Sequence, residues 1–522
     1  MAGTKEGLIK FPAKTFKTTV HNMRKLLTVV LAFSTTISFA QKANNPVPFA
    51  KTITPADLRK HLFIVAGKEM EGRETATEGQ RKAAAYIENE FRRIGLEPGN
   101  KGSFQHYYSV YQDSLTGASF EVNGKSFQLD RDFNASVTNT DATMRFSEIV
   151  VVGPGSTDTL KNANLTGRLV LFFPPAPQPG GGRTQGQGQA NIAATLWSKG
   201  AAGIISVVNG YPRTTPISRK GNQAISLFRR TVTPQTFSVS ETIAREILGK
   251  DFDVAKANIA AIKTYQSNIL LDVQKTTIKL ESSNVIGVLP GTDKKDEYLF
   301  ITAHYDHEGK RGDSVIYYGA DDDGSGTVGV IEIAEAFVKA KAAGKGPRRS
   351  VVFMTVSGEE KGLWGSDFYG KNPIFPLEKT TADLNIDMIG RSDTARKGDT
   401  TNYVYVVGDD KLSSELKPIS EAQNNKYTKL ELDYKFNDPN DRNRIYYRSD
   451  HYNFAKHGVP IIFYYDGMLA GDYHKPTDTP EKINYDLLAK RAQLVFYTAW
   501  EMANRAEMVK RDIPLDRNVF NR

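Results

Sequence analysis

The sequence of 522 residues contains no cysteine. No disulfide can therefore brace the fold, and any metal site must be built from histidine, aspartate and glutamate, because thiolate ligands are absent. The usual cysteine-based structural zinc sites are excluded for the same reason. No lipid-anchoring cysteine follows the N-terminal segment, and no later stretch is long and apolar enough to span a bilayer. We therefore expect no stable membrane anchor.

A clustered basic surface is also missing. The formal net charge of +9 would suggest nucleic-acid binding if it were concentrated in one place. Residues 1–40 hold six lysines or arginines against one acid, so this segment carries +5 and the rest of the chain only +4. That remainder is spread along the sequence. Nucleic acid is therefore not an expected partner.

The first 40 residues instead resemble an export signal. A short cationic run, Met23 to Lys25, precedes a mostly apolar stretch, Leu26 to Ala40. Ser38 and Ala40 place small residues at the two positions that a signal peptidase reads. The pattern predicts cleavage after Ala40 and a secreted or periplasmic protein. Residues 1–22 fit no part of such a signal, and we interpret Met23 as the true start.

The remaining chain is too long for one ordinary domain, so we expect one large domain with a smaller companion. Helical spacing of apolar residues marks Gln80 to Ile94, after a helix start at Thr54 to Asp57. The sequence pattern changes at about residue 135, where short β-rich runs are separated by glycine, proline and asparagine. We expect four segments: 1–40, 41–134, 135–265 (an inserted domain) and 266–522.

After Asn284 the pattern becomes strand, loop and helix, repeated. The helix-like runs are Thr327–Ala343, Ser449–His457 and Leu487–Asn504. Apolar strands alternating with amphipathic helices indicate an α/β fold with a mostly parallel mixed sheet and helices on both faces. The strand-like runs are Val285–Leu289, Tyr298–Thr302, Ser350–Val356, Ala382–Ile386, Tyr403–Val407 and Val459–Tyr464.

Five short polar segments each follow a predicted strand or lie in the loop beyond one. Ligands of open α/β sheets bind at the carboxyl ends of the strands, so these loops can converge on one place. Two histidines and several carboxylates gathered there suit a divalent metal, above all zinc. The segments are His304-Tyr305-Asp306, Gly319 to Gly326, Ser357-Gly358-Glu359-Glu360, Asn385-Ile386-Asp387-Met388 and Tyr473-His474-Lys475-Pro476.

Taken alone, each segment has an ordinary structural interpretation. The acidic triplet Asp321–Asp323 could cap the helix that follows it, and its spacing does not match an EF-hand calcium loop. Glu359-Glu360 could be an exposed helix start. Asp387 is harder to explain this way, because an acid directly after an apolar strand is costly unless it is paired or bound to metal. The order of all five segments, each at a strand end, favours a common site.

That order resembles the di-zinc aminopeptidase family, whose relatives include glutamate carboxypeptidase, glutaminyl cyclase and the transferrin receptor. The resemblance covers residues 284–505, with 52–98 as the family's leading helices. Residues 135–265 resemble a protease-associated domain, on the basis of Val150 to Gly155, Leu165 to Val170 and Lys199 to Gly203. The resemblance implies a peptide substrate and two zinc ions.

Carried onto this sequence, the resemblance implies that His304 and Asp387 bind one zinc ion. Glu360 and His474 would bind the other, and Asp322 would bridge the two. It also implies two catalytic residues. Asp306 would hydrogen-bond the far nitrogen of His304, and Glu359 would be the general base.

Peptide hydrolysis agrees with these roles. It requires an activated water, a polarised carbonyl and a proton for the departing amine. Two zinc ions supply the first two, and a glutamate whose pKa is raised by enclosure can move the proton. The oxyanion donor stays open among Tyr446, Tyr447 and Tyr465, none of which the sequence distinguishes from a core aromatic residue.

Other functions remain open at this point. A carboxypeptidase of the same fold needs a cation for the terminal carboxylate, and Arg442, Arg444 or Arg448 could provide it. A glutaminyl cyclase would hold a single zinc ion. A metal-free binding protein would have lost its ligands, yet all five ligand positions and the base are present in this chain.

The export signal generates the first prediction. Cleavage after Ala40 should leave a mature protein that begins at Gln41. N-terminal sequencing of the exported protein checks this. Exported protein that still begins upstream of Met23 would contradict it.

Overall fold

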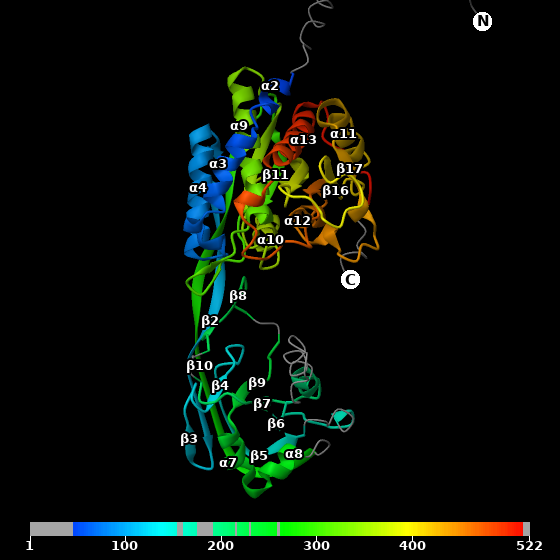
Figure 1. Cartoon of the computed structure of the whole chain (residues 1–522). Coiled ribbons are helices and arrows are strands. Elements are labelled where there is room, and N and C mark those ends of the chain that lie inside the picture. Colours follow the sequence, from blue (N-terminus) through cyan, green and yellow to red (C-terminus); the bar gives the residue numbers. More distant parts are fainter. Residues whose placement is uncertain are drawn as a thin grey trace, which may run out of the picture.

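A computed structural model describes residues 45–153, 160–174, 192–213, 217–228, 231–257 and 262–514. The predicted signal peptide lies outside these residues. The described chain forms two lobes, one above the other in Figure 1, joined by two long strands. Among the described residues, no helix combines the length and the apolar character needed to cross a membrane.

The upper lobe is built on a mixed sheet. Four neighbouring strands run parallel in the order β18, β15, β11, β14. Antiparallel strands flank them on both sides, β16 next to β18 and β10 next to β14. The expected mostly parallel mixed sheet is therefore confirmed. The bounds are β10 Ile262–Leu289, β11 Lys294–His304, β14 Arg349–Val356, β15 Thr380–Ile386, β16 Tyr403–Val407, β17 Glu431–Asp433 and β18 Ile461–Tyr465.

The central strands are apolar on both faces because helices cover both faces. All eight residues of β14 are buried. Val351 and Phe353 point into a core with α3 (Pro55–Val65), α4 (Glu78–Ile94), α9 (Gly326–Ala342) and α13 (Tyr485–Asn504). Val352 and Met354 point the other way, into a core with α10 (Trp364–Lys371) and α12 (His451–Lys456). This is the period of two that a strand between two helical layers requires.

The helix boundaries follow local sequence signals. The Thr54 side chain accepts a hydrogen bond from the Asp57 backbone N–H at the start of α3, which has Pro55 at its first position. The helix α4 ends at Gly95, whose φ of 94° a residue with a Cβ rarely adopts. The expected strands and helices of the upper lobe are confirmed to within a few residues at their ends, except that the strand expected at Val285–Leu289 is the last part of β10, which begins at Ile262.

The lower lobe has its own core. Its strands lie in the order β5, β6, β7, β9, β4, and α7 (Glu241–Leu248) and α8 (Phe252–Ala257) belong to the same part of the chain. Leu115, Phe120 and Phe133 pack in this core, so the lobe also contains residues before the expected boundary at 135. The bounds are β4 Phe133–Ala135, β5 Ala142–Val152, β6 Leu169–Phe172, β7 Gly203–Val207 and β9 Gln235–Val239.

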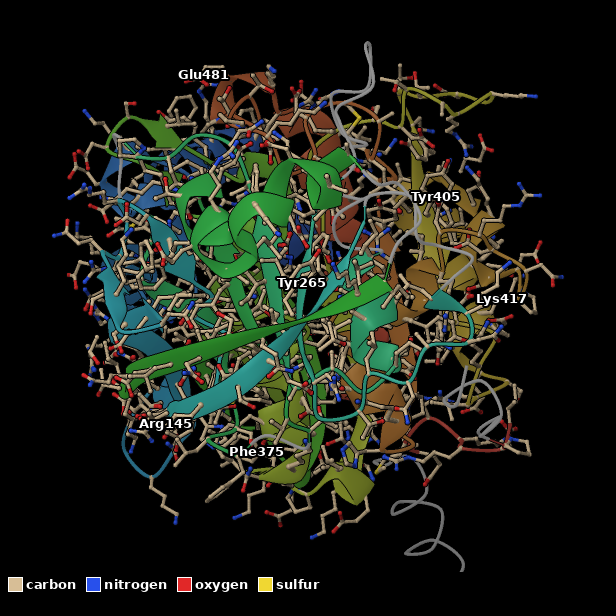
Figure 2. The ribbon with its side chains drawn as sticks, turned by 90° about the horizontal axis from the view of Figure 1, so that it is seen from below. Arg145, Tyr265, Phe375, Tyr405, Lys417 and Glu481 are labelled. Carbon is tan, nitrogen blue, oxygen red and sulfur yellow. The ribbon has the colours of Figure 1, made fainter. Side chains whose placement is uncertain are left out.

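A long antiparallel ribbon joins the lobes. Strand β2 (Gln105–Val122) pairs with β10 from Gln105↔Val285 to Val122↔Ile269. Strand β10 pairs with β5 in the lower lobe and with β14 in the upper lobe, so one continuous sheet runs through the molecule. Tyr265 of β10 packs against the core of the lower lobe, and Tyr405 of β16 lies in a core of the upper lobe. Figure 2 shows both residues from below.

Arg73 connects the N-terminal helices to the loops at the strand ends. Its side chain is fully buried at the end of a short helical segment, η2 (Lys68–Arg73). Nε donates to the Tyr305 carbonyl at 2.7 Å, and Nη2 donates to the Gly319 carbonyl at 2.9 Å. Nη1 donates to the carbonyls of Val65 and Tyr318 at 2.9 and 2.7 Å. One guanidinium therefore satisfies four carbonyl groups from three segments.

This arrangement generates a stability prediction. Arg73→Met should lower the free energy of unfolding by about 3 kcal/mol or more, because it leaves buried carbonyls without donors. Arg81→Met is the matched control, since Arg81 is 56% exposed and pairs with Glu78 on the surface of α4. It should cost less than about 1 kcal/mol. Urea denaturation of both variants checks the difference, and equal shifts would contradict the role of Arg73.

Candidate metal centre

His304 is the last residue of β11, at the carboxyl end of the strand. Its backbone N–H donates to Asp323 Oδ2 at 3.1 Å. Its ring Nδ1 lies 3.1 Å from the backbone carbonyl oxygen of Asp306 and 3.8 Å from the carboxylate Oδ1 of the same residue. The hydrogen bond that orients the ring therefore goes to the carbonyl of Asp306, where the sequence predicted the carboxylate.

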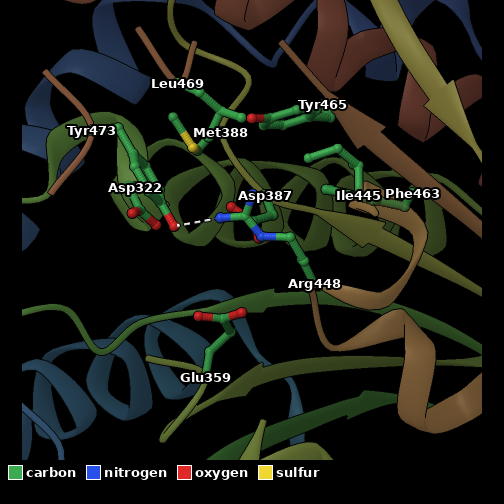
Figure 3. A pocket seen from close by; sticks show the side chains of 10 residues that line it. All are labelled: Asp322, Glu359, Asp387, Met388, Ile445, Arg448, Phe463, Tyr465, Leu469 and Tyr473. Carbon is green, nitrogen blue, oxygen red and sulfur yellow. Dashed lines mark hydrogen bonds between the residues drawn. The ribbon is translucent and has the colours of Figure 1, made fainter. Parts of the chain in front are cut away.

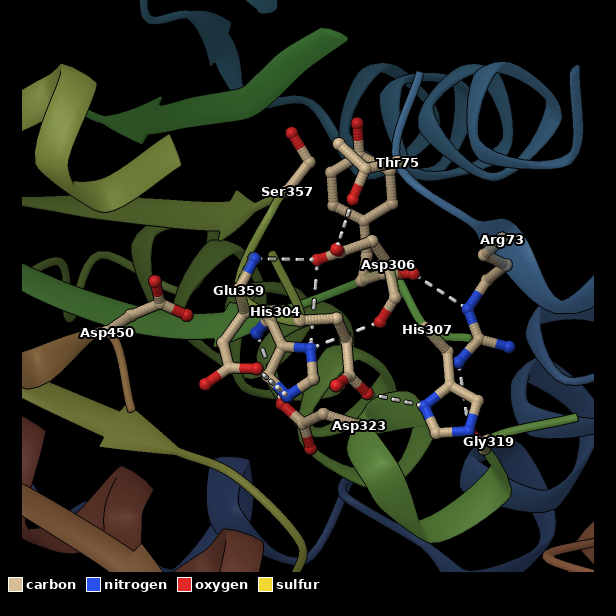
Figure 4. Close-up of polar contacts among 12 residues, drawn as sticks. Arg73, Thr75, His304, Asp306, His307, Gly319, Asp323, Ser357, Glu359 and Asp450 are labelled. Atoms are coloured by element: carbon tan, nitrogen blue, oxygen red, sulfur yellow. Dashed lines mark hydrogen bonds and ion pairs between the residues drawn. The ribbon is translucent and has the colours of Figure 1, made fainter. Parts of the chain in front are cut away.

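The Asp306 carboxylate instead accepts hydrogen bonds from two other segments of the chain. It accepts a hydrogen bond from the Thr75 hydroxyl at 2.6 Å and from the Glu359 backbone N–H at 3.2 Å (Figure 4). Asp306 thus joins the loop after β11 to the loop after β14 and to the segment that follows Arg73. It positions both His304 and Glu359 without facing the cavity.

The three consecutive acids of the loop before α9 point to different partners. Asp321 Oδ1 accepts from the Gly390 N–H at 2.8 Å, and Asp323 Oδ1 accepts from the Gly326 and Met388 N–H groups at 2.8 and 3.0 Å. These two carboxylates are bound to backbone. Of the three, Asp322 is left to face the histidines.

Asp478 fixes the backbone of this loop from the other side. Its carboxylate accepts hydrogen bonds from the N–H groups of Asp321 and Asp322 at 3.0 to 3.2 Å. Asp478 lies four residues after His474, so the loop that carries this histidine is tied to the loop that carries Asp322. Asp478 lies two residues beyond the predicted segment Tyr473-His474-Lys475-Pro476, and the sequence suggested no role for it.

The predicted ligands converge around Asp322. His304 Nε2 is 3.2 Å from Asp322 Oδ1 and 3.6 Å from Asp387 Oδ1. His474 Nε2 is 3.1 Å from Asp322 Oδ2 and 3.0 Å from Glu360 Oε2. The two oxygens of Asp322 therefore face two different histidines. Each histidine also has a second carboxylate beside it.

These separations fit shared metal ions. Two ligand atoms that each lie about 2.1 Å from a tetrahedral zinc ion are about 3.4 Å apart. Within the described chain, His304 Nε2, His474 Nε2, Asp322 Oδ2 and Glu360 Oε1 are buried and make no hydrogen bond of good geometry. Buried polar atoms without hydrogen bonds are rare, and a divalent cation would satisfy them. The residues present therefore fit two zinc ions.

The sequence did not identify a third histidine at the site. His307 is fully buried, and its Nδ1 lies 2.8 Å from Glu360 Oε1 and 3.8 Å from Asp322 Oδ2. His307, Asp322 and Glu360 thus form one group of possible ligands. The sequence could have indicated His307 as a ligand candidate, because it follows Asp306 in the same loop after β11.

The charges of the cluster act strongly on one another. Burial alone would lower the pKa of His304, but the carboxylates of Asp387 and Glu359 raise it well above its usual value. Burial opposes the ionised form of Asp322 as well, yet His304 and His474 hold its pKa well below the ordinary range. Negative charge at this site therefore requires positive partners, which is the electrostatic setting of a cation site.

Glu359 lies beside this cluster, on the cavity side. Its Oε2 is 3.9 Å from His304 Nε2. Burial raises the pKa of Glu359 well above its ordinary value. Its backbone N–H donates to Asp306, as described above. The neighbouring Glu360 faces His307 and His474 instead, so the two consecutive glutamates have different surroundings.

A cavity opens next to Glu359, Asp322 and Asp387 (Figure 3). One part of its wall is apolar and the other is polar. The apolar part is formed by Met388, Ile445, Phe463 and Leu469, and the polar part by Arg448, Tyr465 and Tyr473. Of the three arginines considered from the sequence, Arg448 is the one that lines this cavity. Of the three tyrosines considered as oxyanion donors, Tyr465 lines it.

Comparison with known proteins agrees with this geometry. Residues 284–499 match the model of peptidase family M28. A probable leucine aminopeptidase from Trichophyton verrucosum is 30% identical over 225 residues, which cover 42% of this chain and 57% of that protein. The chain thus spans little more than half the length of the curated relatives it matches.

Two solved structures share the fold of nearly the whole chain. An aminopeptidase from Aneurinibacillus sp. strain AM-1 superposes with a TM-score of 0.52 at 17% identity, covering 90% of this chain and 99% of that one. A zinc aminopeptidase from Bacillus subtilis gives 0.50 at 18% identity, covering 88% and 99%. Residues 284–499 are thus similar to peptidase family M28, and the ligand geometry of this part of the chain agrees with that similarity.

Proposed function

We propose that the chain is an exported, two-zinc exopeptidase, most specifically an aminopeptidase. The observation that carries this proposal is the position of Asp322, whose two carboxylate oxygens lie 3.2 Å from His304 Nε2 and 3.1 Å from His474 Nε2. A carboxylate between two histidines can bridge two metal ions. The family match and the relatives named as leucine and zinc aminopeptidases support the choice of activity.

The proposed ligands divide into two sets around Asp322. His304 and Asp387 would hold one zinc ion, and Glu360 and His474 the other. When bound, the two ions would supply Lewis acidity and lower the pKa of a water molecule. The backbone carbonyl of Asp306 keeps His304 Nδ1 protonated, so that Nε2 presents its lone pair to the site.

Glu359 is the proposed general base. Its burial favours the protonated form, so the side chain can hold a proton taken from water and release it again. The Asp306 carboxylate fixes the backbone of Glu359, which places the side chain at the cavity wall. Glu359 would pass the proton to the nitrogen of the departing amine. Binding metal and moving protons are thus assigned to neighbouring residues with different surroundings.

The apolar part of the cavity would receive the side chain of the terminal residue. Met388, Ile445 and Phe463 are all buried there, and Leu469 completes the wall. Burying an aliphatic side chain of the substrate against such a surface is favourable by about 1.5–3 kcal/mol. An apolar terminal residue is therefore the proposed preference.

The proposal predicts a dependence on metal and on a free amino group. The purified protein should contain two divalent ions per chain, lose activity to a chelator and regain it with zinc or cobalt. It should cleave Leu-Gly-Gly at least about 100-fold more efficiently than N-acetyl-Leu-Gly-Gly, because blocking removes a charged group near the carboxylates. Elemental analysis and kcat/KM for both peptides are the measurements.

The other activities give different results in the same assays. A carboxypeptidase would cleave the N-acetylated peptide at a similar rate. A glutaminyl cyclase would hold one zinc ion and release ammonia from peptides that begin with glutamine. A non-catalytic binding protein would turn over no peptide, and active protein with only trace metal would contradict the two-zinc proposal outright.

The sharpest prediction compares Glu359 with Glu360. Glu359→Gln keeps the shape of the side chain but cannot accept a proton, so kcat should fall by about 10²–10⁴ with both metals retained. Glu360→Gln removes an anionic ligand, so one site should lose metal and added zinc should restore part of the activity. Metal content and turnover are measured side by side.

Each variant is the control for the other. Loss of metal in Glu359→Gln and retention in Glu360→Gln would show that the assignment is wrong by one residue. Unchanged turnover in both variants would refute the proposed active site.

A further inference from the structure

Arg448 is a cation at the edge of the acidic site. It lies between a short helical segment, η8 (Ile445–Tyr447), and α12, and its guanidinium faces the cavity near Asp387 and Tyr473 (Figure 3). Glu359 lines the same cavity. The proposed base and this arginine therefore face the same cavity.

The backbone around Arg448 is held firmly. The Asn385 side chain donates to the Ser449 hydroxyl at 2.9 Å, and the Ser366 hydroxyl is bonded to the Asp450 carboxylate at 2.5 Å. His451 Nε2 lies 2.8 Å from the Tyr446 carbonyl oxygen. The residues on both sides of Arg448 are thus anchored to the upper lobe, and the side chain projects from a fixed base.

The guanidinium of Arg448 forms no ion pair within 4.0 Å among the residues that the structure describes, although the charge of the nearby Asp387 acts on it. It donates a hydrogen bond to the hydroxyl of Tyr473 at 3.1 Å. The Tyr473 ring stacks on His474, with centroids 3.9 Å apart and an angle of 22° between the planes. Tyr473 therefore holds one edge of the guanidinium beside the proposed metal ligands and leaves other N–H donors facing the cavity.

Another arginine near the cavity loops is paired. Arg391 forms an ion pair with Asp472, the residue before Tyr473, at 3.2 Å. Arg448 differs from Arg391 by facing the cavity without a carboxylate within 4.0 Å in the described chain. A planar guanidinium with free donors matches a carboxylate, which it can bind through two parallel hydrogen bonds.

We propose that Arg448 binds the free α-carboxylate of a short peptide, so that the enzyme prefers dipeptides with an unblocked C-terminus. This inference rests on the proposed function. A dipeptide carries an ammonium group at one end and a carboxylate at the other, and the cavity presents both acidic side chains, Glu359 and Asp387, and the cation of Arg448. The apolar wall receives the first side chain, so the α-carboxylate is the group that reaches the guanidinium.

The test compares Leu-Ala with Leu-Ala-NH₂, which have the same free amine, the same first side chain and the same scissile bond. Arg448→Met keeps the length of the side chain and removes the charge. It should lower kcat/KM for Leu-Ala by about 10–100-fold, and for Leu-Ala-NH₂ by less than about 3-fold. Arg448→Lys keeps the charge but loses the planar pair of donors. Its kcat/KM for Leu-Ala should therefore lie between those of the wild type and Arg448→Met.

Arg444→Met is the control variant. Arg444 lies four residues earlier, its guanidinium is over the Tyr447 ring at 4.9 Å, and it does not line the cavity. Its kcat/KM should stay near the wild-type value for both peptides. Metal content is measured for every variant, so that a change in the metal site is recognised.

A binding measurement separates this inference from the proposed function. In the Glu359→Gln background, calorimetry should show tighter binding of Leu-Ala than of Leu-Ala-NH₂, and Arg448→Met should remove the difference. Equal binding of the two peptides would overturn the role of Arg448 while leaving the peptidase proposal intact. Absence of turnover and metal in the wild-type protein would refute the peptidase proposal itself.

Two kinetic outcomes would also overturn the inference. An equal fall in kcat for Leu-Ala and Leu-Ala-NH₂ would place Arg448 at the scissile carbonyl and not at the carboxylate. A loss confined to Glu-Ala-NH₂, a peptide with an acidic first side chain and a blocked C-terminus, would show that Arg448 recognises a side chain.

Discussion

Burial of several carboxylates at one edge of a sheet is the constraint that organises this molecule. Asp306, Asp321, Asp322 and Asp323 are each at most 3% exposed. Removing a carboxylate from water costs several kcal/mol unless hydrogen bonds or opposite charges replace the water. Three of the four receive backbone N–H donors, and Asp322 faces two histidines. Asp322 is therefore the one of these four carboxylates that is available to bind a cation.

The backbone around these acids adopts conformations that would not persist without support. Arg73, Met388 and His474 have φ values of 54°, 57° and 52°, in the left-handed region that residues with a Cβ rarely occupy. Each such residue costs on the order of 1–3 kcal/mol. The supports are the bonds already described: Asp323 to the Met388 N–H, Asp478 to the loop before α9, and the carbonyl groups around Arg73. These hydrogen bonds therefore offset the conformational free energy of the strained residues and hold the proposed metal ligands in place.

Much of this arrangement could be predicted from the sequence, because its signals are local. The buried parts of β11, β14 and β15 are rich in apolar residues, and the polar segments stand at their ends. The order of the segments then suggested how they meet. The ribbon of β2 and β10 could not be found in this way, because its residues alternate between partly exposed and buried and its pairing joins distant parts of the chain.

Side-chain orientation was the second limit. The sequence shows that His304 and Asp306 are two residues apart, but not that the ring would bond the carbonyl oxygen of Asp306 and not its carboxylate. It shows Arg442, Arg444 and Arg448 within seven residues, but the turn at Ile445–Tyr447 decides that only Arg448 of the three reaches the cavity. Both facts depend on the path of a loop. Loop paths depend on contacts with residues far away in the sequence.

The lower lobe is connected to the proposed site by hydrogen bonds. Strand β8 (Lys220–Ala224) pairs with β2, and Gln223 Nε2 donates to the Thr75 carbonyl at 3.0 Å. The hydroxyl of Thr75 in turn bonds the Asp306 carboxylate, which holds the backbone of Glu359. A chain of hydrogen bonds therefore leads from the lower lobe to the proposed base. Because β10 is also a single strand of both lobes, the lower lobe is joined to the site by the sheet as well as by these hydrogen bonds.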